Sequence, residues 1–199
     1  MSTVITHIDQ LDMNKTYSYA DYFSWKFIER LELIKGKIFT MSPAPSRIHQ
    51  KVSMNLTLLF GTFFKSHPCN LYIAPFDVRF PKKEISDNKI YDVVQPDLCV
   101  ICDNSKLDDR GCIGSPDLIV EILSPGNSKK ELHDKYELYR DNGVKEYWII
   151  HPSEQTVLIY KLVENEYVPS RLYNGEETIG SSLFPDLDID LKEVFADKI

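Results

Sequence analysis

The sequence lacks the motifs through which glycine-rich loops bind phosphate. It has only eight glycines in 199 residues, and neither GxxxxGK[ST] nor GxGxxG occurs, so a nucleotide-binding fold built on a phosphate loop loses most of its support. HExxH and GxSxG are also absent, which disfavours the zinc-protease and esterase classes.

Long apolar runs and an excess of positive charge are missing as well. No segment approaches the roughly 18 apolar residues that a membrane span needs, and residues 1–10 lack a basic start and an apolar signal core. We therefore expect a cytoplasmic protein that does not associate with membranes. The formal net charge of −7, from 23 basic and 30 acidic residues, argues against a protein that coats nucleic acid, although it is compatible with a local positive cleft.

Cysteines are few, and their spacing does not favour a metal site. Of the four, Cys69 and Cys112 are isolated, and Cys99 and Cys102 form a CxxC within an apolar run that is typical of a strand. Side chains three positions apart on a strand point to opposite faces, whereas a metal-binding pair needs a turn. We expect reduced, mostly buried thiols.

The apolar pattern predicts one α/β domain over residues 1–199, with a mixed central sheet flanked by helices and with additional β-hairpins. An N-terminal helix and hairpin occupy 1–45, a core about 46–151, and a hairpin and strand extension 152–199. Within these parts we expect helices at 17–30, 46–66 and 128–142, the last with a capping box formed by Ser128 and Glu131. Strands are expected at 71–80, 96–102, 117–123 and 145–151, and hairpins at 31–41 and 157–173.

Glu121 stands out because it lies in the apolar stretch Pro116-Asp117-Leu118-Ile119-Val120-Glu121-Ile122-Leu123. A strand this apolar is expected to be covered on both faces, and a buried carboxylate is costly without a cation or good hydrogen bonds. Glu121 either pairs with an arginine, caps a turn at the strand end, or binds a metal ion.

Asp97 has a similar setting at the start of the apolar strand 98–102. If the two strands are neighbours, Asp97 and Glu121 meet at one edge of the sheet, where two carboxylates repel unless a hard cation such as Mg²⁺ lies between them. The alternative for Asp97 is a turn residue before a strand.

Lys135 is the third candidate site residue. It follows the Glu121 strand on the predicted helix, beside the stripe formed by Leu132, Tyr136 and Tyr139. Its long stem could bring the ammonium to the carboxylates; otherwise it extends to solvent or pairs with Glu131.

Several short motifs follow one another along the chain. They are Tyr17-Ser18-Tyr19-Ala20-Asp21-Tyr22, Glu32-Leu33-Ile34-Lys35-Gly36-Lys37, Met41-Ser42-Pro43-Ala44-Pro45, His49-Gln50, Gln95-Pro96-Asp97, the stretch from Pro116 to Pro125, Lys135-Tyr136-Glu137-Leu138-Tyr139, Gly143-Val144-Lys145-Glu146-Tyr147-Trp148-Ile149-Ile150 and Leu183-Phe184-Pro185. In their residues and their order they resemble the Uma-type restriction-endonuclease family of the PD-(D/E)xK nuclease superfamily. The resemblance covers nearly the whole chain and is most specific from Pro116 to His151.

This resemblance implies a restriction-endonuclease-like core and assigns Asp97 and Glu121 as Mg²⁺ ligands. The sequence departs from the superfamily pattern where a basic residue would ordinarily stand two positions after Glu121, because that residue is Leu123. In the Uma-type pattern the lysine is on the following helix, here Lys135.

Two further residues have open roles. The resemblance suggests that Glu32 is an acid near the site, although an exposed hairpin residue is an equal alternative. His49 could approach a phosphate or assist proton transfer, or it could be a surface or capping residue.

Two functional hypotheses follow. In the first, the protein is an endonuclease that hydrolyses DNA with Mg²⁺, or Mn²⁺, held by Asp97, Glu121 and the carbonyl of Ile122. In the second, it is a non-catalytic module on a nuclease-like scaffold that binds nucleic acid or protein. The apolar hairpin 157–173 could form a homodimer or simply cover the sheet.

Overall fold

A computed structural model describes residues 5–41, 45–83, 85–124 and 129–197, the last range with side chains from 132 onward. Its centre is a sheet in which strands β9 and β10 are parallel and the other neighbouring strands are antiparallel. The strand order is β12 (Glu166–Pro169), β11 (Thr156–Val163), β10 (Glu146–His151), β9 (Leu118–Ile122), β6 (Leu98–Ile101) and β3 (Asn70–Ile73), and β13 (Tyr173–Asn174) also pairs with β11.

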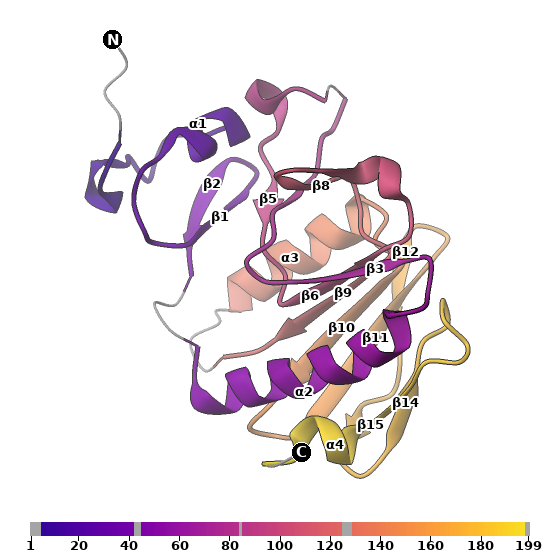
Figure 1. The fold of residues 1–199 in the computed structure, drawn as a ribbon. Coiled ribbons are helices and arrows are strands. Elements are labelled where there is room, and N and C mark those ends of the chain that lie inside the picture. Colours follow the sequence, from indigo (N-terminus) through magenta and orange to yellow (C-terminus); the bar gives the residue numbers. More distant parts are fainter. Residues whose placement is uncertain (1–4, 42–44, 84, 125–128, 198–199) are drawn as a thin grey trace.

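Helices cover both faces of this sheet, which confirms the predicted mixed α/β fold (Figure 1). Helix α2 (Arg47–Phe64), capped by Ser46, buries Leu56 and Phe60 against the face that carries Val100 and Val120. Helix α3 (Lys129–Asp141) packs on the other face, and its Tyr139 belongs to the same apolar cluster as Cys99 and Ile119. The expected capping box of α3 lies outside the described residues. No described helix is long and apolar enough to cross a membrane.

Strands from residues 31–113 form a second sheet. Its order is β2 (Lys37–Thr40), β1 (Leu31–Ile34), β5 (Val93–Val94), β4 (Val78–Arg79), β8 (Gly111–Ile113) and β7 (Leu107–Asp108). The predicted hairpin 31–41 is present, and its turn residues Lys35 and Gly36 have φ values of 53° and 72°. Two consecutive positive φ angles are typical of the tight turns that join twisted strands.

Two predicted elements are shorter than expected. The helix expected at 17–30 is α1 (Tyr19–Ser24), which ends because Trp25 adopts an extended conformation and packs against Tyr17 and Tyr22. The single strand expected at 71–80 is divided between β3 and β4, which belong to different sheets. Pro75 lies between them and has no N–H with which to continue a ladder.

The C-terminal part covers the central sheet. It ends in β14 (Thr178–Gly180), β15 (Asp188–Asp190) and α4 (Leu191–Phe195), and the alternating Leu187, Ile189 and Leu191 are buried beside α2. In the hairpin 157–173, Tyr167 packs into the cluster below α3. The hairpin therefore covers part of the sheet, and its role in a homodimer stays a prediction.

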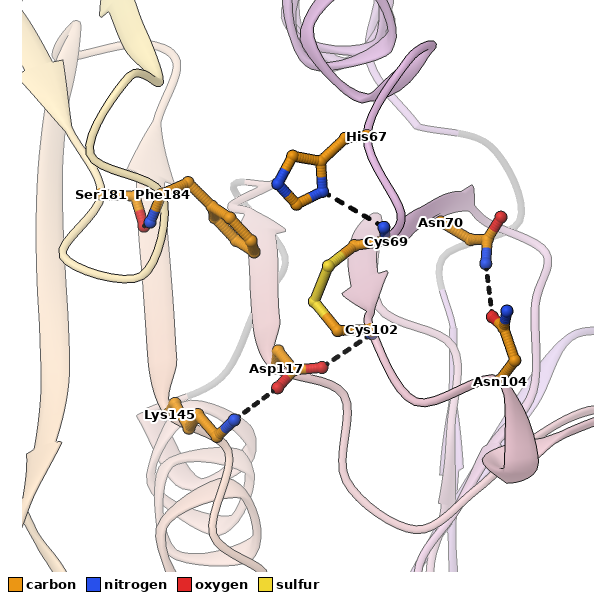
Figure 2. Close-up of a disulfide and its surroundings, with 9 residues drawn as sticks. All are labelled: His67, Cys69, Asn70, Cys102, Asn104, Asp117, Lys145, Ser181 and Phe184. Atoms are coloured by element: carbon orange, nitrogen blue, oxygen red, sulfur yellow. Dashed lines mark hydrogen bonds and ion pairs between the residues drawn. A yellow bond between two sulfur atoms is a disulfide. The ribbon is translucent and has the colours of Figure 1, made fainter.

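A disulfide between Cys69 and Cys102 contradicts the expectation that these two thiols are reduced (Figure 2). The register of β3 on β6 pairs Asn70 with Ile101, so the two cysteines stand opposite each other one step beyond the ladder, with a Cα–Cα distance of 4.0 Å. The spacing of cysteines along the chain does not reveal this pairing. Cys99 and Cys112 are free and buried, as predicted.

Candidate functional site

The pairing of β6 with β9 places the two predicted acids at the same end of neighbouring strands. Leu98 pairs with Val120 and Cys99 with Ile119, and one more antiparallel step sets Asp97 opposite Glu121. The prediction that the two strands are neighbours in one sheet is therefore confirmed. Asp97 Oδ2 accepts a hydrogen bond of 2.8 Å from the N–H of Ile122, which fixes this carboxylate against the end of β9.

A buried ammonium links two of the predicted acids. Lys135 Nζ lies 3.0 Å from Glu121 Oε1 and 3.0 Å from Glu32 Oε1, and the three residues are only 4%, 8% and 1% exposed. Lys135 therefore does not extend to solvent, and Glu32 is not an exposed hairpin residue. The side chain of Glu131, the other expected partner of Lys135, lies outside the described residues. Glu121 pairs with a lysine rather than with an arginine. Burying these charges is tolerable because each carboxylate has a cation at hydrogen-bond distance.

The charges in this cluster do not balance. Burial first, and then the neighbouring Asp97 and Glu32, raise the pKa of Glu121 to about 7, although Lys135 and the hydrogen bond from Tyr139 oppose this rise. Burial alone would lower the pKa of Lys135, but the two glutamates raise it well above its ordinary value, so this ammonium stays charged. Negative charge is therefore in excess around Glu121.

His49 contacts Asp97 from the first turn of α2. Its Nε2 lies 3.4 Å from Asp97 Oδ1, and the ring is buried instead of lying on the surface. Burial opposes its protonated form, but the hydrogen bond and charge of Asp97, together with the carbonyl of Ile122, raise the pKa of His49. The His49 Nδ1 is buried without a hydrogen-bond partner among the described residues. All five predicted site residues thus lie in one connected region.

Two residues of this region were missed by sequence reasoning. The Tyr139 hydroxyl donates a hydrogen bond of 2.6 Å to Glu121 Oε1, and the main-chain N–H of Gln95 donates one of 2.9 Å to Glu32 Oε1. Tyr139 follows Lys135 by four positions and shares its helix face, which is a signal that could have been used. Gln95 precedes Asp97 by two residues, but its contact with Glu32 depends on the packing of the two sheets.

The chemistry of the donor set fits a hard divalent cation. Asp97, Glu121 and the carbonyl of Ile122 supply only oxygen, the ligand type that Mg²⁺ prefers. Burial first, and then the charges of Asp97 and Glu32, disfavour the ionised form of Glu121, and a bound cation would favour it. Within the described ranges, no group of three or more histidine, cysteine, aspartate or glutamate side chains could hold a metal. Any ion here would need the main-chain carbonyl and water to complete its ligands.

Comparisons with known proteins agree with this architecture. The sequence matches the family model Uma2, described as "Putative restriction endonuclease", over residues 19–192. An uncharacterized protein of Synechocystis, slr1290, is 26% identical over 146 residues, which are 72% of this chain and 73% of that protein. The crystal structure of a "putative nuclease belonging to DUF820" from Anabaena variabilis has a similar fold, with a TM-score of 0.67 at 21% identity, over 89% of this chain and 97% of that one. Because the family model spans most of its length, the chain belongs to the Uma2 family of nuclease-like proteins.

Proposed function

We propose that this protein is an endonuclease that hydrolyses the phosphodiester bonds of DNA with Mg²⁺, or with Mn²⁺ in its place. The observation that supports this proposal best is the pairing of β6 and β9, which sets Asp97 opposite Glu121 while Lys135 contacts Glu121. Metal-dependent phosphodiester hydrolysis uses carboxylates that hold a cation and a positive group that offsets the charge of the phosphate. The description of the Uma2 family is consistent with this activity.

Each residue has a distinct part in the proposed mechanism. Asp97, Glu121 and the carbonyl of Ile122 would hold the cation, which when bound lowers the pKa of a water molecule and offsets charge on the phosphate. Lys135 uses two of its three N–H groups on Glu121 and Glu32, and among its described partners the third is left for a phosphate oxygen.

The surrounding residues keep these groups in place. Glu32 holds the ammonium of Lys135, and Tyr139 holds Oε1 of Glu121, so both groups are oriented before substrate arrives. His49 orients Asp97 and, when protonated, places a positive charge beside it. These are positioning roles.

Cleavage of plasmid and single-stranded DNA in Mg²⁺, in Mn²⁺ and in a chelator tests the proposal. Asp97→Ala and Glu121→Gln should each lower the rate by a factor of about a hundred or more, because each removes a ligand of the proposed cation. Asp117→Asn is the matched control, since Asp117 precedes β9 at its other end, where it contacts Lys145 and Cys102. Asp97→Ala cleaving DNA as fast as the wild type would refute the proposal.

One observation favours a non-catalytic binding module as a second candidate. Both carboxylates already have protein donors, Asp97 from the Ile122 N–H and Glu121 from Lys135 and Tyr139. A structural network could be complete in this form. A wild type that binds DNA or a protein but cleaves nothing in either metal, and an Asp97→Ala variant with unchanged binding, would establish this alternative.

A further inference from the structure

A pocket of about 210 Å³ opens beside Asp97, along the first turns of α2. Arg30, His49, Ser53 and Asp97 supply polar groups to its lining. Met54 and Ile73 supply an apolar part, and they are unusually accessible for apolar residues, at 56% and 47% exposure. The pocket thus lies beside Asp97, and its lining combines the basic side chain of Arg30 with the apolar side chains of Met54 and Ile73.

Arg30 differs from the other arginines of the chain. The sequence has six arginines, and in the described structure five of them form ion pairs with carboxylates: Arg47, Arg79, Arg110, Arg140 and Arg171. Arg30 forms no ion pair with a described residue; its guanidinium instead contacts the neutral amide of Gln95. The positive charge of Arg30 is therefore not offset by a described carboxylate, and its remaining N–H donors can bind an anion.

A partly buried network of hydrogen bonds fixes the direction of this guanidinium. Nε and Nη2 of Arg30 donate hydrogen bonds of 2.9 and 2.7 Å to Gln95 Oε1. The amide nitrogen of Gln95 donates in turn to Asp77 Oδ1 at 2.8 Å and to the Tyr22 hydroxyl at 3.2 Å, so the amide cannot rotate without losing these partners. Arginine has five N–H donors, and the two that Gln95 accepts leave one N–H of Nη2 and both N–H groups of Nη1 without a partner among the described contacts.

We propose that this pocket binds the nucleotide next to the scissile phosphate, with Arg30 on the phosphate of that nucleotide. The inference rests on the proposed nuclease function and adds a substrate-binding residue to it. A planar guanidinium suits a phosphate because it can donate two parallel hydrogen bonds. Met54 and Ile73 provide an apolar surface for the sugar or base. Pockets for drug-sized ligands measure about 300–1,000 Å³, so this one, at about 210 Å³, has room for no more than one nucleotide unit.

Neutralising one phosphate at a time tests this contact. Oligonucleotides with a single methylphosphonate at each position within two nucleotides of the cleaved bond keep the shape of the backbone but lose one charge. At one position beside the cleaved bond, the wild type should lose about tenfold in kcat/KM, because a charge-assisted hydrogen bond is removed. The Arg30→Ala variant should have a kcat/KM about tenfold lower than the wild type on the unmodified substrate. Neutralising the phosphate at that position should not lower its kcat/KM further.

Two further variants make the result specific. Arg140→Ala removes a guanidinium that is paired with Asp141, and it should keep the wild-type pattern. Arg30→Lys retains the charge without the planar donor pair and should recover only part of the rate. Thermal unfolding of all variants checks that the exposed Arg30 position does not affect folding.

The outcomes separate this inference from the proposed function. If the wild type cleaves DNA but no single neutral phosphate affects it, or if Arg30→Ala shows the same tenfold loss at that phosphate, the Arg30 contact is wrong and the nuclease function stands. If the wild type cleaves no DNA with either metal, the proposed function fails, and the inference that depends on it fails too.

Discussion

Glu121→Gln changes one buried charge while it preserves the shape of the site. The glutamine keeps an oxygen that can accept from Lys135 and Tyr139, and Lys135 keeps Glu32 as its partner. The substitution therefore turns two carboxylates around one ammonium into a balanced pair. In the absence of divalent ions, we expect the variant to be more stable than the wild type at neutral and mildly alkaline pH.

The size of this effect follows from the pKa of Glu121, which rises from 4.5 to about 7 on folding. Between these values the folded protein holds a proton that the unfolded chain has released, so stability falls as the pH increases through this window. A rise of this size corresponds to about 3 kcal/mol of unfolding free energy, as an upper estimate for a fully buried group. Glutamine resembles the protonated acid and does not titrate, so its advantage should be largest at about pH 8.

Urea unfolding in a chelator between about pH 5 and pH 8 measures this difference. Glu146→Gln is the matched control, because Glu146 is also a buried glutamate but accepts hydrogen bonds from Ser181, Ser182 and Trp148. A glutamine there would turn an amide donor toward other donors and should destabilise the protein by about 1–3 kcal/mol. A Glu121→Gln variant that is less stable than the wild type at pH 8, or a difference that does not vary with pH, would refute the reasoning.

Other expected outcomes concern single contacts. Lys135→Met leaves two buried carboxylates without their cation and should lower the unfolding free energy by about 3–5 kcal/mol in urea titrations at pH 8, and Glu121→Gln in the same chain should restore part of that loss. Reduction of the Cys69–Cys102 bond, which spans 33 residues, should lower stability by about 3–4 kcal/mol, whereas a Cys69→Ser/Cys102→Ser variant should not respond to dithiothreitol. Because the pKa of His49 is raised on folding, its stabilising contribution should be present below about pH 6.5 and be lost as the pH rises through its folded value, and His49→Gln should remove this component from the pH profile of unfolding.

The parts of the fold that could be predicted are those in which a local pattern decides the structure. The amphipathic spacing predicted a helix over 46–66, and the structure has α2 at Arg47–Phe64. The apolar segments 96–102 and 117–123 predicted two buried strands, which the structure has as β6 and β9. The expectation that Asp97 and Glu121 meet depended on these strands being neighbours, which the sequence alone did not decide. Local patterns were insufficient where tertiary packing determines the structure. An example is the early end of α1, where Trp25 already has an extended backbone.

Contacts between distant residues explain what could not be predicted at the site. Lys135 and Glu32 are 103 residues apart, and they meet because α3 packs between the central sheet and the strand β1. Cys69 and Cys102 meet because of the register of β3 on β6, and the sequence does not show that these two strands are neighbours. In each case the residue types were visible in the sequence, but the pairing is a property of the register and of sheet packing.

The charge count in the site favours function over structure as the reason for its composition. A single glutamate would suffice to hold the buried Lys135, and apolar residues of the same volume are often no less stable than a buried ion pair. The chain instead places Glu32 and Glu121 around Lys135, and Asp97 beside His49, and the pKa of Glu121 is raised, first by burial and then by Asp97 and Glu32. Perturbed ionisable groups of this kind concentrate at functional sites, where a ligand restores the balance. An excess of buried negative charge that a divalent cation would relieve is therefore the strongest structural argument for a metal-dependent activity in this chain.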